Sequence, residues 1–408
     1  MDEQQTFDVV VVGAGPAGLM AGLACAESGL RTAVAGPEAD PRDSRSAALL
    51  DGSVNLLKRL GVWQQLAAAS EPLTAIRLID ATGTLLRAPE VLFRASEIGL
   101  PAFGYNVPNA ALTAALEATS HSNLTRLIDR KATVVDLAGN SAMLSTNSHG
   151  MLGARLVIAA DGRDSPTRTA AGIKTSSWSY TQAAVVTAFS HSRPHYGIST
   201  ELHRRAGPLT VVPGPGNTSN LVWVETKEDA ERLMALDAAE FTRELSGHIG
   251  SLLGMLSDFA PRRTYPLSGR TASPLAAHRV VLVGEAAHVI PPIGAQGLNL
   301  GFRDAATIAE FAGDAQCAGE DIGGDALLER YGRARQSDVA FRVFAVDLLN
   351  RSLLSSIPGA HLARGFGLFA LASNRALRAR VMREGVMPST SNPSLMRPFA
   401  ATGEITAG

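Results

Sequence analysis

The stretch RVVLVGEAAHVIPPIGAQGLNLGFRDA, residues 279–305, decides the fold of this 408-residue chain. Its first part, Arg279–Val283, is a short apolar run rich in valine, which predicts a buried β-strand. Gly284 ends this strand. We therefore expect the carboxylate of Glu285 to lie at the carboxyl edge of a sheet.

An irregular loop and a helix are predicted after this strand. Pro291, Pro292 and Gly294 forbid regular structure in the loop. From Gly297 onward the apolar spacing predicts a helix, and small residues occupy its first turn. A helix start with uncovered backbone N–H groups is an anion-binding site. A plain structural connection is the alternative, but two prolines and four glycines would serve packing poorly.

The N-terminal residues predict a second ligand-binding turn. Phe7–Val12 is an apolar run typical of a strand covered on both faces, Leu19–Ser28 is alanine-rich and helical, and Thr32–Ala35 predicts the next strand. Residues 13–18, GAGPAG, form a G-x-G-x-x-G sequence between the first strand and the helix. Glycines in this context let the backbone approach a pyrophosphate at the helix N-terminus, so we expect a bound dinucleotide.

A third turn follows another predicted strand, Ala154–Ala160. This strand ends at Asp161-Gly162, and Ser165 and Arg168 come shortly after. An aspartate beside phosphates would be repulsive unless backbone groups or ribose hydroxyls hydrogen-bond to it. Asp-Gly alone is a common turn, but the serine and arginine at this spacing favour a functional motif.

These three segments resemble the flavin-binding motifs of the single-component FAD aromatic hydroxylases, in the family's order. Residues 284–299 resemble G-D-A-A-H-x-x-x-P-x-x-G-x-G-x-N, with Glu285 in place of the usual, shorter aspartate. Residues 160–168 resemble A-D-G-x-x-S-x-x-R, which the family uses near the pyrophosphate and in handling NAD(P)H. The ending of residues 296–304 is most similar to the ubiquinone-biosynthesis hydroxylase branch.

The resemblance implies which residues bind the cofactor. Arg45 is expected to contact the flavin diphosphate or ring, because family members carry an arginine before an Ala-Leu helix, here within Pro41–Leu50. No catalytic side chain and no metal ligand is identifiable. The flavin-proximal loop consists of Pro292, Gly294, Gln296 and Gly297. The implied cofactor-binding residues are Gly13, Gly15, Ala17, Gly18, Arg45, Asp161, Gly162, Glu285, Pro292, Gly297, Leu298, Asn299 and Asp304.

One expected residue is missing from the second strand. The acid that usually closes this strand onto the adenosine ribose is replaced by Gly36. Glu38 or Asp40 could reach the ribose instead, or the ribose has weaker protein contacts. If the missing carboxylate weakens FAD binding, Gly36→Glu should strengthen it.

The strand and helix pattern predicts an α/β fold with an antiparallel sheet and C-terminal helices, and the resemblance implies a Rossmann-like FAD-binding domain with an interleaved antiparallel-sheet substrate domain. Short strands separated by Gly-Pro turns fill Thr181–Glu225, and Leu233–Leu253 is helical in composition. We assign residues 1–75, 106–172 and 266–325 to the FAD-binding domain, 76–105 and 173–265 to the substrate domain, 326–387 to a C-terminal helical segment and 388–408 to a disordered tail.

The resemblance implies an FAD- and NAD(P)H-dependent monooxygenase, or aromatic hydroxylase. NADPH or NADH would reduce FAD, dioxygen would form a C4a-hydroperoxyflavin, and its outer oxygen would attack an electron-rich ring. The ubiquinone branch suggests a prenylated phenol as the aromatic substrate. One alternative is a non-oxygenating flavoprotein of the same fold, of the prenyl reductase or halogenase type. Another is a flavin-binding scaffold subunit of a biosynthetic complex. Consumption of NAD(P)H and dioxygen in the presence of substrate separates these alternatives.

The composition limits which binding partners and which cellular location we expect. A net charge of −1 gives no reason to expect a nucleic acid partner. The N-terminus does not resemble a signal peptide, so we expect a cytoplasmic protein, with peripheral contact at the inner membrane as an open alternative. Residues 330–383 contain ten arginines and only two aspartates, which indicates either a solvated basic face or attraction to anionic lipid. Cys25 and Cys317 are expected to be buried thiols, and His191, His195 and His203 to lie on the surface.

Overall fold

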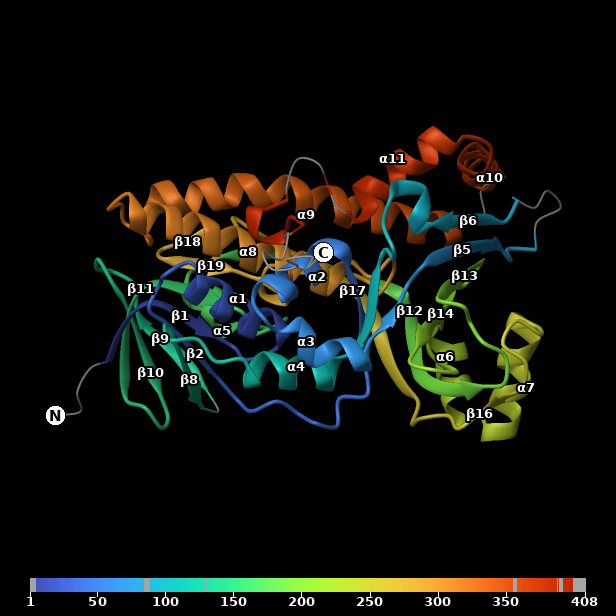
Figure 1. The fold of residues 1–408 in the computed structure, drawn as a ribbon, viewed down its shortest axis with the longest axis horizontal. Coiled ribbons are helices and arrows are strands. Elements are labelled where there is room, and N and C mark those ends of the chain that lie inside the picture. Colours follow the sequence, from blue (N-terminus) through green and yellow to red (C-terminus); the bar gives the residue numbers. More distant parts are fainter. Residues whose placement is uncertain are drawn as a thin grey trace, which may run out of the picture.

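The computed structural model describes residues 5–83, 89–129, 131–354, 358–386, 388 and 392–398, built around two large sheets and a small one (Figure 1). The first large sheet has the strand order β18-β19-β11-β1-β2-β8, and β9 and β10 extend it beside β11. Its strands are β1 (Gln5–Val12), β2 (Thr32–Gly36), β8 (Leu124–Ile128), β9 (Ala132–Asp136), β10 (Ala142–Thr146), β11 (Met151–Ala159), β18 (Ala276–Ala277) and β19 (Val280–Leu282).

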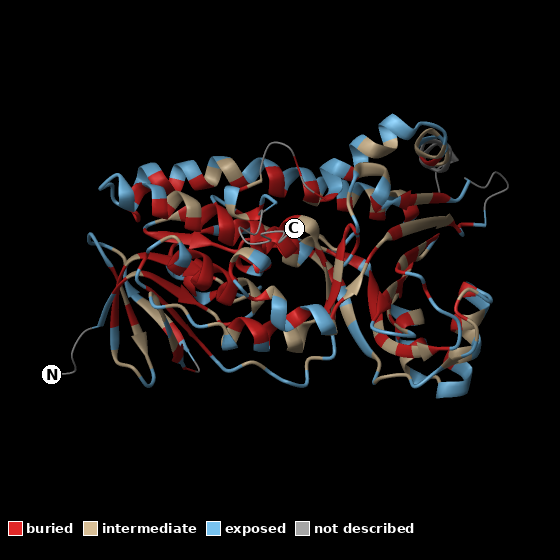
Figure 2. Ribbon diagram, in the orientation of Figure 1, coloured by how far each residue is buried: buried red, intermediate tan, exposed pale blue. Residues whose placement is uncertain are grey.

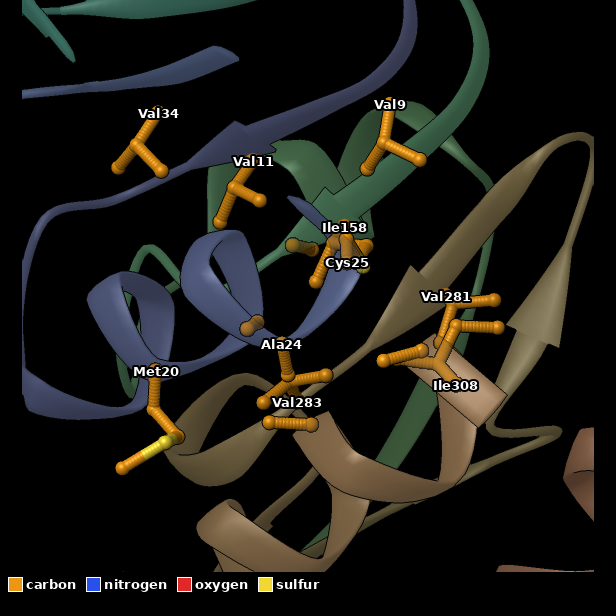
Figure 3. Close-up of a cluster of buried hydrophobic side chains, with 14 of the residues drawn as sticks. Val9, Val11, Met20, Ala24, Cys25, Val34, Ile158, Val281, Val283 and Ile308 are labelled. Atoms are coloured by element: carbon orange, nitrogen blue, oxygen red, sulfur yellow. The ribbon is translucent and has the colours of Figure 1, made fainter. Parts of the chain in front are cut away.

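Helices cover this first sheet because its central strands are apolar on both faces. Val9, Val10 and Val11 of β1 are fully buried. The helices near this sheet are α1 (Pro16–Glu27), α2 (Asp51–Arg59), α3 (Trp63–Leu66), α4 (Asn109–Ala118), α5 (Pro166–Ala170) and α8 (Gln296–Cys317). Figure 3 shows Met20 and Ala24 of α1 in one apolar cluster with Val281 and with Ile308 of α8. The strand–turn–helix units predicted around β1 and β19 are therefore joined in one core.

The second large sheet has the order β20-β17-β12-β15-β14-β13-β5-β6, with β16 beside β12. Its strands are β5 (Ala75–Asp80), β6 (Val91–Arg94), β12 (Lys174–His191), β13 (Ile198–Arg204), β14 (Gly207–Gly214), β15 (Thr218–Thr226), β16 (Leu256–Ser257), β17 (Arg263–Ser273) and β20 (His288–Val289). The antiparallel pairing of β12, β15 and β14 matches the sheet predicted for this stretch. The domain boundaries proposed above remain a prediction.

The stretch Leu233–Leu253, which is helical in composition, is divided between two helices. α6 (Lys227–Ala235) ends before Asp237, and α7 (Ala238–Ile249) begins after it. The Asp237 carboxylate accepts a hydrogen bond from the Glu240 backbone N–H at 2.7 Å, and the Glu240 side chain accepts one from the Asp237 N–H. This capping box starts a new helix, a signal that composition alone does not show.

The prediction of a helix within Pro41–Leu50 was wrong. Residues Ser46–Leu50 form strand β3, which pairs with β7 (Gly104–Pro108) in a small sheet completed by β4 (Glu71–Pro72). Ala47 lies opposite Val107 in this pairing. Pairing with a distant strand here outweighs the helix propensity of alanine and leucine, and helix starts only at Asp51, with α2.

The C-terminal helices connect both large sheets. They are α9 (Asp325–Leu354), α10 (Pro358–Ser373) and α11 (Arg375–Val386). On α9, the Tyr331 hydroxyl donates to the Leu282 carbonyl at 2.7 Å, and Asp347 accepts from the Tyr180 hydroxyl of β12 at 2.6 Å. Figure 1 shows α9 lying along α8 and continuing toward the second sheet. No helix in the described ranges is long and apolar enough to cross a membrane.

Two further expectations need correction. Part of the predicted disordered tail packs against the fold: the short 3-10 turn Ser394–Met396 contacts α2 and α8, and Met396 is buried. The remaining 3-10 turns are Ala67–Ala69, Ala95–Ile98 and Gly284–Ala286. Cys25 is buried, which raises the pKa of its thiol to about 12, but Cys317 is exposed. Figure 2 shows buried residues concentrated around the first sheet and α8, and many exposed residues on α11.

Candidate functional site

The three predicted turns meet at one edge of the first sheet. Strands β1, β11 and β19 are neighbours and run parallel. Val12 lies beside Ala159, and Ala159 beside Leu282. The turns that follow these strands are residues 13–18, 161–162 and 284–285. The carboxyl edge of a parallel sheet is the usual place for a ligand in such folds.

The glycines of the first turn have two different roles. A Cβ on Gly13, which has a φ of 109°, would lie 2.3 Å from the Ala160 carbonyl oxygen, and one on Gly18 would lie 1.9 Å from the Gly13 oxygen. These two glycines allow the turn to pack against β11 and α1. A Cβ on Gly15, in contrast, would meet no described atom within 4 Å. The open backbone over Gly15, at the start of α1, is therefore where a ligand can approach.

The Asp161 carboxylate serves the protein itself. It accepts hydrogen bonds from the Ser165 hydroxyl and, at 3.0 Å, from the Thr167 N–H, at the start of the short helix α5. Arg168 donates to the Ala286 carbonyl at 2.9 Å and to the Arg163 carbonyl at 3.1 Å. The Asp-Gly segment is thus tied to the turn after β19, which fixes two sides of the candidate site relative to each other.

The loop before α8 leaves the start of that helix open. Gly294 and Ala295 have φ values of 68° and 54°, in the left-handed region that suits glycine and is unusual for alanine. α8 begins at Gln296, and no side chain of the described residues caps it. A Cβ on Gly297 would also meet nothing within 4 Å of the described chain. The first amides of α8 can therefore face a ligand that carries negative charge.

Two residues of the implied cofactor set point into the protein. Asn299 is buried, and its side chain makes four hydrogen bonds that tie β3 and α2 to α8. It accepts from the Leu50 N–H at 2.9 Å and the Ser53 hydroxyl at 2.7 Å, and donates to the Ala48 and Ala295 carbonyls at 2.8 and 2.6 Å. The neighbouring Leu298 is half-buried. These contacts make Asn299 a support of the turn.

Asp304 is the second inward-facing residue and is the centre of a buried charge network. Its carboxylate accepts from the Gly284 N–H at 3.1 Å, from His288 Nε2 at 2.7 Å and from Arg335 Nε at 2.7 Å. Burial alone would raise the pKa of Asp304, but His288 and Arg335 outweigh it and hold that pKa below its ordinary value.

The network continues to α9 through Asp338. Its carboxylate accepts from Arg303 and Arg335 at 2.8 Å each, and from Arg342 Nε at 2.9 Å. Burial opposes ionisation of Asp338, but the three arginines keep its pKa well below the ordinary value. Arg342 also donates to the Gln296 side chain, at the first residue of α8. The sequence motifs did not reveal these partners, although the spacing of Arg335, Asp338 and Arg342 on one helix face was a usable signal.

Arg45 and Glu285 lie at the exposed side of the candidate site. The Arg45 guanidinium pairs with Asp43 at 2.7 Å, which was not anticipated. This hydrogen bond is the main reason that the pKa of Arg45 is raised, with smaller contributions from Tyr265 and Glu285. Glu285 is exposed. Arg45 precedes a strand, so its position relative to the turns comes from β3.

The structure gives a steric argument against the expectation that Gly36→Glu would strengthen cofactor binding. A Cβ on Gly36 would lie 2.6 Å from the Ala14 backbone nitrogen, so the first turn would have to move. Arg126 donates to the carbonyls of Gly36 and Pro37 at 3.0 and 2.7 Å. A cavity of about 670 Å³ beside this strand end is lined by Glu38 and Arg126, among other residues.

The remaining sequence candidates are Asp40 and three histidines. Asp40 is exposed and paired with Arg42 at 2.9 Å. His191, His195 and His203 are buried, so their predicted surface location was wrong. Their rings make hydrogen bonds inside the protein; His191, for example, is 3.0 Å from the Ser219 hydroxyl of β15. No cluster of His, Cys, Asp or Glu suited to a metal ion occurs within the ranges that the structure describes.

Known proteins resemble this chain over nearly its whole length. A family model described as an FAD binding domain matches residues 6–344. Ubiquinone hydroxylase UbiL of Rhodospirillum rubrum is 35% identical over 391 residues, covering 93% of this chain and 89% of the relative. The 3-demethoxyubiquinol 3-hydroxylase of Escherichia coli is 27% identical, covering 93% and 98%. The crystal structure of p-nitrophenol 4-monooxygenase PnpA from Pseudomonas putida DLL-E4 has a TM-score of 0.75 at 20% identity, covering 93% and 98%.

Proposed function

The chain belongs to the FAD binding domain family, together with the ubiquinone hydroxylases that it resembles, and from this membership we propose its reaction. It is an FAD-dependent monooxygenase that hydroxylates an aromatic ring, with NADPH or NADH as co-substrate. The proposed substrate is a prenylated phenol of ubiquinone biosynthesis. One observation carries the proposal: the three turns that resemble flavin motifs meet at the carboxyl ends of neighbouring strands β1, β11 and β19.

The residues at this edge fit FAD. Gly15 presents open backbone at the start of α1, which suits a diphosphate. Gly297 presents open backbone at the start of α8, which suits the electron-rich side of a flavin ring. The cavity beside Glu38 lies next to the end of β2, where the adenosine part of a dinucleotide belongs. We propose that FAD spans these places, with Asp161 and Asn299 holding the turns.

When bound, FAD takes a hydride from NAD(P)H and activates dioxygen, so that one oxygen atom enters the ring and the other leaves as water. The protein orients the flavin and excludes water from the site. The N-terminal amides of α8 stabilise negative charge as it develops on the flavin. Arg168 fixes the Asp-Gly segment against the turn after β19, so two sides of the site stay at a fixed distance from each other. No other catalytic group is required by this chemistry.

The C-terminal helices support a substrate that is collected from a lipid surface. Phe341, Phe344 and Leu348 are spaced to share one face of α9, and all three are exposed, Phe341 by 68%. Phe366, at 74%, and Phe369 are exposed on α10. Large exposed apolar side chains grouped on helices indicate an interaction surface. A prenyl tail costs about 0.8 kcal/mol per CH₂ to expose to water, so a lipid-bound substrate needs such a surface.

The arginine content of these helices needs a narrower interpretation than the sequence suggested. Arg335 and Arg342 are buried in the charge network and cannot reach a membrane. Arg375, Arg380 and Arg383 on α11 are exposed. Each exposed arginine contributes about 1 kcal/mol near anionic lipid, so these three together with the exposed phenylalanines support reversible peripheral contact.

The test combines turnover with lipid binding. Purified protein loaded with FAD should oxidise NAD(P)H and take up dioxygen with a prenylated phenol, and far less with the same phenol lacking its tail. Phe341→Ser with Phe344→Ser should reduce flotation with anionic liposomes, whereas Met255→Ser, at a residue 79% exposed and outside these helices, should not. Equal turnover of both phenols would refute the prenylated substrate. Equal flotation of the two variants would refute the docking surface.

A further inference from the structure

The buried charge network carries a surplus of positive charge next to the start of α8. It contains the cations Arg303, Arg335 and Arg342 and the anions Asp304 and Asp338, so positive charges exceed negative ones by one even before His288, which is hydrogen-bonded to Asp304, is counted. Burial lowers the pKa of Arg303 only to about 10, so this arginine stays charged at neutral pH. All five side chains are buried. In such surroundings charges act more strongly than in water.

Arg342 is the member of this network that reaches the flavin-proximal loop. Its Nε donates to Asp338 at 2.9 Å, and its Nη1 donates to the side-chain oxygen of Gln296. Gln296 in turn donates to the Gly294 carbonyl at 2.8 Å. The guanidinium therefore links α9 to both the left-handed loop and the first residue of α8. A planar, always charged fork suits such a two-sided contact better than an ammonium group does.

This contact adds a link to α9 at a helix start that Asn299 already ties to β3 and α2. Ala295, which precedes the helix, is in a left-handed conformation that costs free energy for any residue with a Cβ. No side chain in the described part of the chain caps the helix. A loop in such a conformation persists only when neighbouring contacts determine it, and Gln296 supplies the side-chain contact from α9.

We propose that Arg342 is a positioning residue: it holds Gln296, and with it the N-terminus of α8, toward the flavin, and so makes the site bind reduced flavin more tightly than oxidised flavin. Transfer of a hydride to FAD adds one negative charge to the ring. A correctly placed helix start, with a surplus positive charge behind it, stabilises that added charge. The inference rests on the proposed function only for the presence of FAD.

The test is the midpoint potential of bound FAD, measured by spectroelectrochemistry without NAD(P)H or phenol. Arg342→Met should weaken binding of reduced flavin about tenfold more than that of oxidised flavin, which lowers a two-electron potential by about 30 mV. Gln296→Met breaks the same hydrogen bond but keeps the charge network, and should shift the potential in the same direction. Both substitutions break the same hydrogen bond between Arg342 and Gln296. The double variant should therefore shift the midpoint potential by less than the sum of the two single shifts.

Arg351→Met is the matched control. Arg351 lies on the same helix, is exposed and pairs with Asp347 at 2.7 Å, so its removal should leave the potential unchanged. A potential for Arg342→Met equal to that of Arg351→Met, or additive shifts in the double variant, overturns the proposal. Should Arg342→Met fail to fold, Gln296→Met decides alone, and an unchanged potential there overturns it. Absence of hydroxylated product with shifted potentials would instead refute the proposed function and leave this inference intact.

Discussion

Gly15→Ala should weaken FAD binding and leave the stability of the fold nearly unchanged. The Gly15 backbone, with a φ of −72°, is in a conformation that alanine adopts readily, and the added Cβ meets no atom of the described chain. Loss of glycine at the helix start should lower the free energy of unfolding by no more than about 1 kcal/mol. The same methyl group would occupy the open face where we place the diphosphate.

The loss of affinity follows from the hydrogen bonds at stake. Displacing the diphosphate from one backbone N–H removes a charge-assisted hydrogen bond worth about 1.5–3 kcal/mol. The dissociation constant for FAD should therefore rise about 10- to 100-fold. Titration of apoprotein with FAD, followed by quenching of flavin fluorescence, measures this directly, and thermal unfolding of the apoprotein measures the folding term.

Gly18→Ala is the matched comparison. Its Cβ would lie 1.9 Å from the Gly13 carbonyl oxygen, so we expect overpacking that destabilises the apoprotein itself by about 1–3 kcal/mol. The reasoning about Gly15 is refuted if Gly15→Ala binds FAD as tightly as the unmodified protein. It is equally refuted if Gly15→Ala loses as much stability without cofactor as Gly18→Ala does.

Three further outcomes are expected. Gly36→Glu should lower the melting temperature of the apoprotein, because its Cβ would lie 2.6 Å from the Ala14 nitrogen; a stabilised protein would contradict this. Asp338→Asn should cost about 3–5 kcal/mol in chemical denaturation, because it leaves buried Arg303 and Arg342 without their carboxylate partner. The folded-state pKa of Asp338 is lowered, so its contribution is present above the unfolded pKa of about 3.9 and is lost as pH falls toward the folded value. Unfolding curves of the wild type and Asp338→Asn should converge in acid. Met396→Ala should destabilise the fold by about 2–5 kcal/mol; no change would mean that the 3-10 turn is not packed in solution.

The features that depend on backbone chemistry could be predicted from the sequence. Valine-rich runs such as Phe7–Val12 predict buried strands, and glycines and prolines mark the turns after them. Because parallel strands share a carboxyl edge, these turns meet in space. The motif could not show whether a polar side chain faces the ligand or the protein. Asn299 and Asp304 occupy motif positions, yet both bind neighbouring segments of the chain.

Features that depend on contacts with distant segments could not be predicted from the sequence. Ala47 belongs to a residue type that favours helix, and only its pairing with Val107 makes it part of a strand. The arginines of α9 resembled a basic surface, but Arg335 and Arg342 turn inward to meet Asp338. In each case the deciding contact lies in another element of the fold, so no local pattern contains it.

The central claim is that this chain inserts one atom of dioxygen into an aromatic ring. The most direct measurement supplies purified protein with FAD, NAD(P)H and a prenylated phenol under oxygen-18 gas, and analyses the product by mass spectrometry. We predict a new hydroxyl group that carries one oxygen-18 atom, formed only when NAD(P)H is present. A product labelled from water, or unmodified phenol despite bound FAD and oxidised NAD(P)H, would contradict the claim.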